Sequence, residues 1–326
     1  MKDTNVPNIE RAIKKVWTPV KRRVSPIHTV APILEPGNWK DFDPFLLMME
    51  DQFGQGAFDV HPHRGIETVT FVIEGTIHHY DSKTGNAGAL HAGDVQWMTA
   101  GRGVVHNETP PEGEQVHVLQ LWVNLPRKHK MTEPRYQDLR AEKMPVRREE
   151  GAYIRVFSGS SGNVHAPTLN YVPVTFVEIV MEEGASIVQD LPPTYNGFIY
   201  VLEGSGIFGA NKREAHKGQA MQLEIPIWDN KDESNKTNEE SHELSEIQET
   251  DESNAAYDSS RKAKDSDTSG TNLGGIRITA NEKLRAILFA GEPLHEPIVA
   301  HGPFVMNTEE EIWQAYEDYR NGTFLK

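Results

Sequence analysis

The sequence predicts an all-β protein with two barrel-like domains and a short C-terminal helix. Runs rich in β-branched and aromatic residues, such as IETVTFVI (66–73) and VHVLQLWV (116–123), recur about every ten residues and are separated by glycine-containing turns. The chain has 326 residues, which is enough for two domains of ordinary size. A repeated segment predicts the second barrel, and one pattern typical of a capped helix predicts the helix.

Two segments of the chain share one pattern. Alignment of Gly75 with Gly204 places HPHRGIETVTFVIEG over DLPPTYNGFIYVLEG without a gap. Such a repeat indicates two β domains of related design, and we place them at residues 1–140 and 141–326. In this alignment His61 falls on Asp190 and His63 falls on Pro192, so the second copy lacks the histidine pair.

The second domain is interrupted by an acidic segment at residues 229–272. The segment is rich in Asp, Glu, Ser and Asn and has few large apolar residues, which is typical of disorder. Sequence typical of strands resumes at residues 275–278 and 285–289. We therefore expect a disordered insertion that serves as a solvated spacer, because a long surface loop costs little stability.

A short C-terminal helix is predicted to begin within residues 307–313. Thr308 and Glu311 have the spacing of a capping box. Four residues form its expected apolar face: Ile312, Trp313, Tyr316 and Tyr319. We expect this helix to serve in packing.

Composition excludes several classes of function. The sequence contains no cysteine, so disulfides, thiolate metal sites and cysteine nucleophiles are excluded. A net charge of −15 is unfavourable for binding nucleic acid through its phosphates. The sequence shows neither a secretory signal pattern nor a membrane span, and we expect a cytoplasmic protein that binds no membrane.

Two short motifs carry side chains suited to metal binding. VHPHRG contains His61 and His63, and VHNE contains His106 and Glu108. Residues i and i+2 of a strand point to the same face, so each pair projects together, and inside a barrel the two pairs can meet. Three imidazoles and one carboxylate leave a coordination position open, as a catalytic metal requires.

The pattern alone leaves alternatives open. Glu67 has the same strand parity as His61 and His63, so it competes with Glu108 as the acidic ligand. Trp97 and Met98, between the motifs, are candidates for an aromatic-binding pocket, although core packing explains them equally well. Four further histidines are rival ligands: His78, His79, His91 and His117.

The blocks HPHRG-x-ETV, GDVQWMTAGRG and H-x-E, together with the C-terminal GPFVMNT, resemble the pirin family of the cupin superfamily. The resemblance covers nearly the whole chain outside the acidic insertion. It implies two cupin barrels of jelly-roll type, with a metal in the first barrel only. It also implies that His61, His63, His106 and Glu108 are the ligands and that Glu67 is not.

The resemblance further implies a function. The leading expectation is a quercetin 2,3-dioxygenase, which opens the heterocycle of a flavonol with O2 and releases carbon monoxide. Glu108 would be the catalytic base, and the cofactor would be one divalent ion, Fe2+ first, with nickel, cobalt, copper or manganese as alternatives. The alternative is a metal-dependent regulatory module that binds a transcription factor or a metabolic enzyme. For either function we expect a monomer. A sugar-phosphate isomerase is a weaker possibility, because no basic cluster accompanies the motifs.

Overall fold

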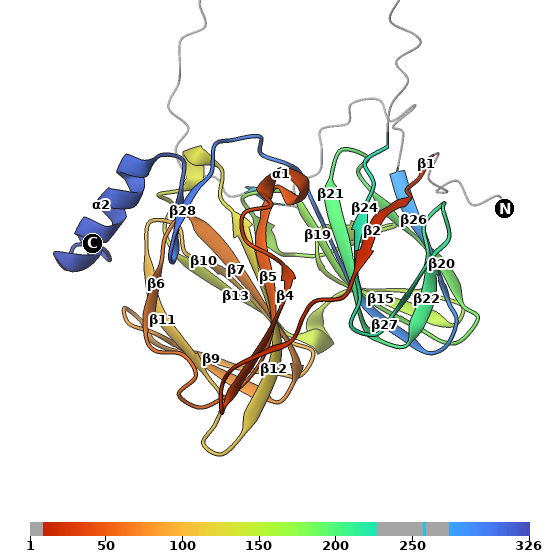
Figure 1. Ribbon diagram of the computed structural model, residues 1–326, viewed down its shortest axis with the longest axis horizontal. Coiled ribbons are helices and arrows are strands. Elements are labelled where there is room, and N and C mark those ends of the chain that lie inside the picture. The colour runs from red at the N-terminus through yellow and green to blue at the C-terminus, as the bar shows by residue number, and fades with distance from the viewer. Residues whose placement is uncertain (1–8, 227–256, 259–273) are drawn as a thin grey trace, which may run out of the picture.

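The computed structural model describes residues 9–226, 257–258 and 274–326, which form two β-barrels side by side (Figure 1). In the first barrel a seven-stranded sheet, in the order β13-β10-β7-β12-β5-β4-β3, faces a four-stranded sheet, β6-β11-β8-β9. The strands of this barrel are β3 (Arg22–Ser25), β4 (His28–Leu34), β5 (Phe45–Gly54), β6 (His61–His63), β7 (Ile66–Glu74), β8 (Thr76–Asp81), β9 (Gly85–His91), β10 (Val95–Thr99), β11 (Val104–Thr109), β12 (Gln115–Asn124) and β13 (Arg135–Leu139).

The second barrel repeats this plan. Its seven-stranded sheet runs β14-β15-β19-β27-β21-β24-β2, and its smaller sheet contains β1, β26, β22 and β23, with β20 paired to β26. The strands of this barrel are β1 (Ile9–Glu10), β2 (Ile13–Trp17), β14 (Val146–Glu149), β15 (Ala152–Ser158), β19 (Val174–Met181), β20 (Ser186–Leu191), β21 (Asn196–Glu203), β22 (Ser205–Phe208), β23 (Arg213–His216), β24 (Ala220–Leu223), β26 (Gly274–Ala280) and β27 (Leu284–Gly291).

Shorter elements connect and flank the barrels. The helical ones are α1 (Trp39–Phe42), η1 (Arg127–His129), η2 (Ala141–Lys143) and α2 (Glu309–Arg320). The extended ones are β16 (Ser160–Ser161), β17 (Val164–His165), β18 (Leu169–Asn170), β25 (Tyr257–Asp258), β28 (Val299–His301) and β29 (Phe304–Met306). The described residues contain no helix that is long and apolar enough to cross a membrane.

The predicted all-β class and the predicted repeat are confirmed. The equivalent glycines Gly75 and Gly204 both follow a central strand of a seven-stranded sheet and both have positive φ values, 88° and 72°. A Cβ atom at Gly204 would lie 1.9 Å from the Lys283 carbonyl oxygen, so a side chain does not fit there. The two barrels therefore share the turn that glycine makes possible.

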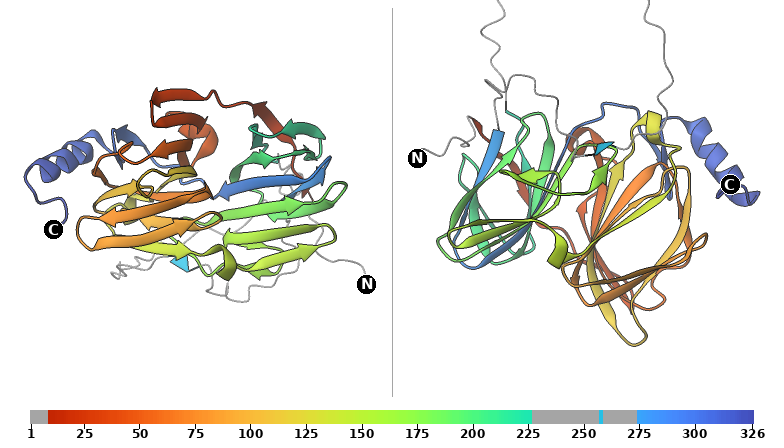
Figure 2. Two further views of the ribbon diagram at one scale, coloured as in Figure 1. Left: turned by 90° about the horizontal axis from the view of Figure 1, so that it is seen from below. Right: turned by 180° about the vertical axis from the view of Figure 1, so that it is seen from behind.

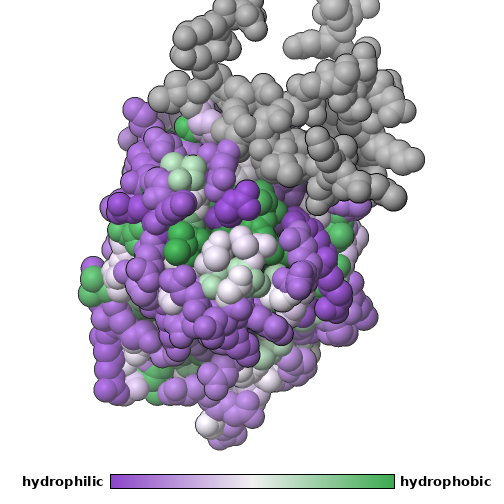
Figure 3. Space-filling model, turned by 90° about the vertical axis from the view of Figure 1, so that its right-hand side faces the viewer, coloured by the Kyte–Doolittle hydropathy of each residue, from purple (hydrophilic) through white to green (hydrophobic). Residues whose placement is uncertain are grey.

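An extensive apolar contact lies between the two seven-stranded sheets. Phe45 of β5 meets Phe198 of β21 edge-to-face at 5.4 Å between ring centroids, and Phe71 of β7 meets Phe176 of β19 at 6.2 Å. Because one face of these sheets lines a barrel interior and the other lies against the neighbouring barrel, strand β7 is buried over most of its length. The outer face of the second barrel, in contrast, is mainly hydrophilic where its side chains are described (Figure 3).

Both ends of the chain cross between the barrels. Near the N-terminus, β1 and β2 join sheets of the second barrel. Near the C-terminus, Phe304 bridges to Arg64 and α2 lies on the flank of the first barrel away from the second (Figure 2). The predicted division at residue 140 remains a prediction. The order of strand patterns along the sequence does not show that either end of the chain crosses between the barrels.

The C-terminal helix begins as predicted but packs differently. Thr308 and Glu311 form the expected capping box. The buried residues of the helix are Ile312 and Ala315, whereas Trp313 is 61% exposed. The predicted apolar face was therefore wrong at Trp313 and at Tyr319, which is also exposed, because the helix contacts the barrel along the Ile312–Ala315 side.

The predicted disorder of residues 229–272 falls almost entirely outside the described residues. The described pair, Tyr257–Asp258, forms β25 and pairs antiparallel with Leu169–Asn170 of β18. The disordered insertion therefore remains a prediction.

We predict that Phe45→Ala lowers the free energy of unfolding by about 3–5 kcal/mol, because it leaves a cavity between the two barrels. Urea denaturation followed by tryptophan fluorescence measures the change. Val24, which is 63% exposed on β3, provides the control: Val24→Ala should stay within about 0.5 kcal/mol of the parent. Equal midpoints for Phe45→Ala and Val24→Ala would show that the inter-barrel contact contributes little.

Candidate metal centre

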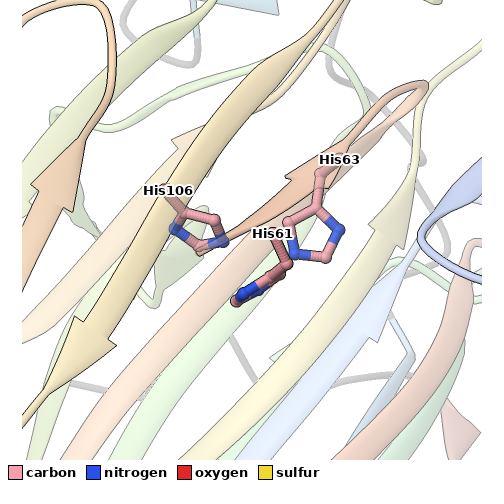
Figure 4. Close-up of side chains that lie close together, drawn as sticks. All are labelled: His61, His63 and His106. Carbon is pink, nitrogen blue, oxygen red and sulfur yellow. The ribbon is translucent and has the colours of Figure 1, made fainter. Parts of the chain in front are cut away.

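Two short strands of the first barrel bring three histidines together. Strands β6 and β11 are antiparallel neighbours, with His61 opposite His106 and His63 opposite Val104. The two histidines of β6 are separated by one residue, so both project to the same side of the strand. Figure 4 shows the rings of His61, His63 and His106 converging from these two strands.

The three imidazoles are close enough to share one ion. One ring nitrogen from each histidine lies within 4.8 Å of those of the other two. The ring centroids are 4.9 Å apart for His61 and His63, 4.5 Å for His61 and His106, and 5.0 Å for His63 and His106. Bonds of about 2.0–2.1 Å from each nitrogen to a central ion are compatible with this spacing.

Burial keeps the rings of His63 and His106 uncharged. His63 is 2% exposed and His106 is fully buried. Burial, reinforced by the neighbouring His61, lowers the pKa of His63 to about 3. Burial and the adjacent histidines also lower the pKa of His106 well below its usual value. The neutral imidazole is the form that binds metal ions.

Hydrogen bonds decide which nitrogen is free. The Nδ1 atoms of His61 and His63 lie 2.8 Å and 3.4 Å from the carbonyl oxygens of Asp59 and Pro303. The Nε2 atoms of His63 and His106 are buried and have no hydrogen-bond partner within the described part of the chain. Unpaired buried polar atoms are costly, and metal-bound histidines commonly use one nitrogen for the ion and the other for a supporting group. The three histidines therefore fit a metal ion.

The predicted fourth ligand lies next to this cluster but outside it. Glu108 follows His106 by two residues on β11. Its Oε1 accepts a hydrogen bond from Thr70 at 3.0 Å, and its Oε2 accepts one from Gln120 at 2.6 Å. The group of three histidines does not include this carboxylate. Metal binding by Glu108 therefore remains a prediction.

The rival carboxylate, Glu67, faces the opposite side of the sheet. On β7, Thr70 contacts Glu108, whereas Val69 and Phe71, which have the same parity as Glu67, belong to the core between the barrels. Gly65, with φ of 80°, separates β6 from β7. The alternation of side chains between the two faces therefore does not continue from β6 into β7, and Glu67 does not share the face of His61 and His63. Glu67 instead accepts a hydrogen bond from Thr99 at 2.6 Å.

The other histidines of the sequence occupy different places. His78 is exposed on β8, and His117 pairs with Glu50 at 2.7 Å on the far side of β12. His91 lies 3.2 Å from the Thr76 hydroxyl on an exposed edge. His79 is the exception: it is 2% exposed, and its Nε2 lies 2.8 Å from Nδ1 of His106. It lies in a second layer behind the cluster.

Trp97 and Met98 do not line an open pocket. Both are buried. Trp97 belongs to the apolar core between the barrels, and Met98 belongs to an apolar cluster of the first barrel with Ile66 and Val104. The aromatic residue beside the histidines is Trp122, whose ring meets that of His63 at 5.1 Å and 83°. It borders an apolar hollow of about 380 Å³, shared with Trp39 and Leu47. On β12, Trp122 lies between the buried apolar residues Leu121 and Val123, which point to the other face of the strand. This alternation was the sequence signal that could have identified Trp122.

The comparisons with known proteins agree with this architecture. Residues 31–123 match the family described as Pirin, and residues 254–325 match the Pirin C-terminal cupin domain. Pirin of Mus musculus is 36% identical over 293 residues, which cover 86% of this chain and 83% of the relative.

The chain belongs to the pirin family. "Pirin-like protein 2" of Arabidopsis thaliana is 36% identical over 287 residues, covering 87% of this chain and 76% of that protein. A solved protein from Geobacillus kaustophilus is 52% identical, with a TM-score of 0.73, and covers 89% of this chain and 99% of its own. A solved quercetin 2,3-dioxygenase from Acinetobacter baumannii is 25% identical, with a TM-score of 0.74, and covers 96% and 98%. These similarities confirm the pirin fold of two cupin barrels.

We predict that His61→Ala and His106→Ala each abolish stoichiometric metal binding, because two imidazoles cannot replace the convergent set of three. Elemental analysis of protein reconstituted with one divalent ion and then desalted measures the loss. His78→Ala, exposed on the adjacent strand β8, is the matched control and should retain full metal content. Full occupancy in both ligand variants would contradict the site.

We predict that Glu67→Gln binds metal normally but changes the pH dependence of stability. Burial raises the pKa of Glu67 to about 7, so the folded protein holds a proton that the unfolded chain releases near pH 4.5. The contribution of that proton to the free energy of unfolding is fully present at low pH and is lost as pH rises through 7. The loss is on the order of 3 kcal/mol.

Urea denaturation of metal-free Glu67→Gln and parent protein at pH 5 and pH 8 measures this effect. The variant should gain stability relative to the parent at pH 8 but not at pH 5. Glu74→Gln, at the exposed end of the same strand, should show no such change. A loss of metal from Glu67→Gln would instead identify Glu67 as a ligand.

Proposed function

We propose that this pirin is a metal-dependent dioxygenase that opens the heterocycle of flavonols such as quercetin with O2 and releases carbon monoxide. The observation that carries the proposal is the set of three histidines, His63 and His106 buried and His61 partly buried, whose Nδ1 atoms have partners and whose other ring nitrogens converge. The likeness to a quercetin 2,3-dioxygenase at 25% identity over nearly the whole chain supports the choice of reaction.

We propose that His61, His63, His106 and Glu108 hold the ion. Nitrogen and oxygen ligands suit Fe2+, our first choice, and also nickel, cobalt, copper and manganese. When bound, such an ion supplies Lewis-acid stabilisation of the deprotonated flavonol oxygen. Three imidazoles and one carboxylate leave room for a substrate oxygen beside the protein ligands.

Glu108 is the proposed base for the flavonol 3-hydroxyl. Its carboxylate is 6% exposed and accepts hydrogen bonds from Thr70 and Gln120. These two donors hold the carboxylate at the edge of the histidine cluster, and each oxygen keeps a second lone pair that can accept a proton. The histidines beside it are metal ligands in this proposal, so Glu108 is the group that accepts the proton.

The apolar hollow beside Trp122 suits a flat aromatic substrate. Trp39, Leu47 and Trp122 line it, and the ring of Trp122 reaches His63. Its volume of about 380 Å³ lies in the usual range for small-molecule sites. A flavonol bound there would exclude water from the side of the histidine cluster that faces Trp122.

We predict that metal-loaded protein consumes quercetin and O2 together and releases carbon monoxide. Glu108→Gln keeps the shape of the side chain but removes the base, so kcat per bound metal should fall by about 10²–10⁴-fold. An oxygen electrode, flavonol absorbance and carbon monoxide trapping measure turnover, with metal content determined on the same samples.

Glu114→Gln, on an exposed loop, is the matched control for this experiment and should turn over flavonol at the parental rate. Fully loaded parent protein that consumes no O2 with several flavonols would contradict the proposal. The binding of a protein partner in a metal-dependent manner would then become the leading function.

A further inference from the structure

His79 lies behind the metal centre on a strand that alternates regularly between surface and interior. Its neighbours His78 and Tyr80 are exposed, whereas His79 and Asp81 are buried. Strand β8 pairs with β11, and His79 lies directly opposite Glu108 in this ladder. The register therefore places a buried imidazole beside two of the proposed ligands, His106 and Glu108.

The contact with His106 is a hydrogen bond between two imidazoles. Nε2 of His79 lies 2.8 Å from Nδ1 of His106, and the ring centroids are 4.7 Å apart. If His106 binds the ion through Nε2, its Nδ1 carries the proton and donates it. Nε2 of His79 must then be the acceptor, and the proton of a neutral His79 ring lies on its Nδ1.

That second nitrogen points toward the carboxylate. Nδ1 of His79 is 3.9 Å from Oε1 of Glu108 and has no hydrogen-bond partner among the described residues. The ring cannot turn away freely, because Tyr136 packs against it edge-to-face at 5.1 Å. Tyr136 is itself fixed by a 2.6 Å hydrogen bond from its hydroxyl to Asp81.

The other two histidines are supported differently. The Nδ1 atoms of His61 and His63 meet backbone carbonyl oxygens of Asp59 and Pro303. Carbonyl groups accept hydrogen bonds only, so they select one tautomer by themselves. A histidine ring accepts or donates, so the tautomer of His106 depends on that of His79.

We propose that His79 is a positioning residue that selects the metal-binding tautomer of His106 and links it to Glu108. The inference rests on the proposed metal centre and goes beyond it by assigning a second layer to the site. His79 touches no reacting atom in this scheme. It orients one ligand through Nε2, and its Nδ1 proton is directed toward the carboxylate of another.

The test measures metal affinity, using Zn2+ and Co2+ in competition with a chelator. His79→Leu removes the acceptor, leaves Nδ1–H of His106 buried without a partner, and should weaken binding by about 10–100-fold. His79→Gln restores a carbonyl acceptor and should recover most of the affinity. His78→Leu, one residue away on the exposed face of β8, should bind like the parent.

A second measurement does not depend on the variants folding. Nitrogen–proton correlation spectra of 15N-histidine-labelled, Zn2+-loaded parent protein report the tautomer of each ring. His106 and His79 should both carry their proton on Nδ1. A proton on Nε2 of His79, or parental affinity in folded His79→Leu, would overturn the inference.

Failure of the inference and failure of the metal centre give different results. If His61→Ala loses the ion and His79→Leu keeps parental affinity, the centre stands and the positioning role is wrong. If the parent protein binds neither Zn2+ nor Co2+, both the centre and the role are wrong.

Discussion

The antiparallel pairing of β6 with β11 is the constraint on which the candidate centre depends. It places His61 opposite His106, so three imidazoles from two strands share one space. A slip of one residue in this register would turn one strand's histidines to the other face of the sheet. Gly65, between β6 and β7, has a φ of 80°, and a Cβ atom there would lie 1.9 Å from the Val305 carbonyl oxygen. The same close contact fixes the C-terminal segment against the strand that carries His61 and His63.

That C-terminal segment makes the first barrel dependent on residues more than 200 positions away. Val305 donates a backbone hydrogen bond to Arg64, and Pro303 offers its carbonyl to His63. Arg64 pairs with Asp318 of α2 at 2.7 Å, and its guanidinium lies over the ring of Phe324. The helix therefore contributes to the environment of the strand that carries two candidate ligands, in addition to covering an apolar surface.

The two barrels share a plan but differ in their interiors. The second barrel is filled by aliphatic and aromatic side chains, including Val177, Ile199 and Phe208. At the position equivalent to His61, Asp190 accepts a hydrogen bond from the Gly162 amide. The interior of the first barrel instead holds buried polar groups supported by Thr70, Gln120 and His79. Among the described residues, the convergent histidines thus occur in one of two copies of the same fold.

The sequence by itself determined the all-β class, the repeated barrels, the capping box at Thr308 and the histidine pairs, because these depend on local alternation and spacing. Only the tertiary structure decided that Glu67 faces the core between the barrels. The extended structure breaks between β6 and β7, so the side-chain alternation that made Glu67 as good a candidate ligand as Glu108 does not continue from one strand to the next. The tertiary structure also decided that His79 supports His106, and that the two ends of the chain cross between the barrels. These features arise from strand pairing between distant segments, and the alternation within one strand contains no information about its partner.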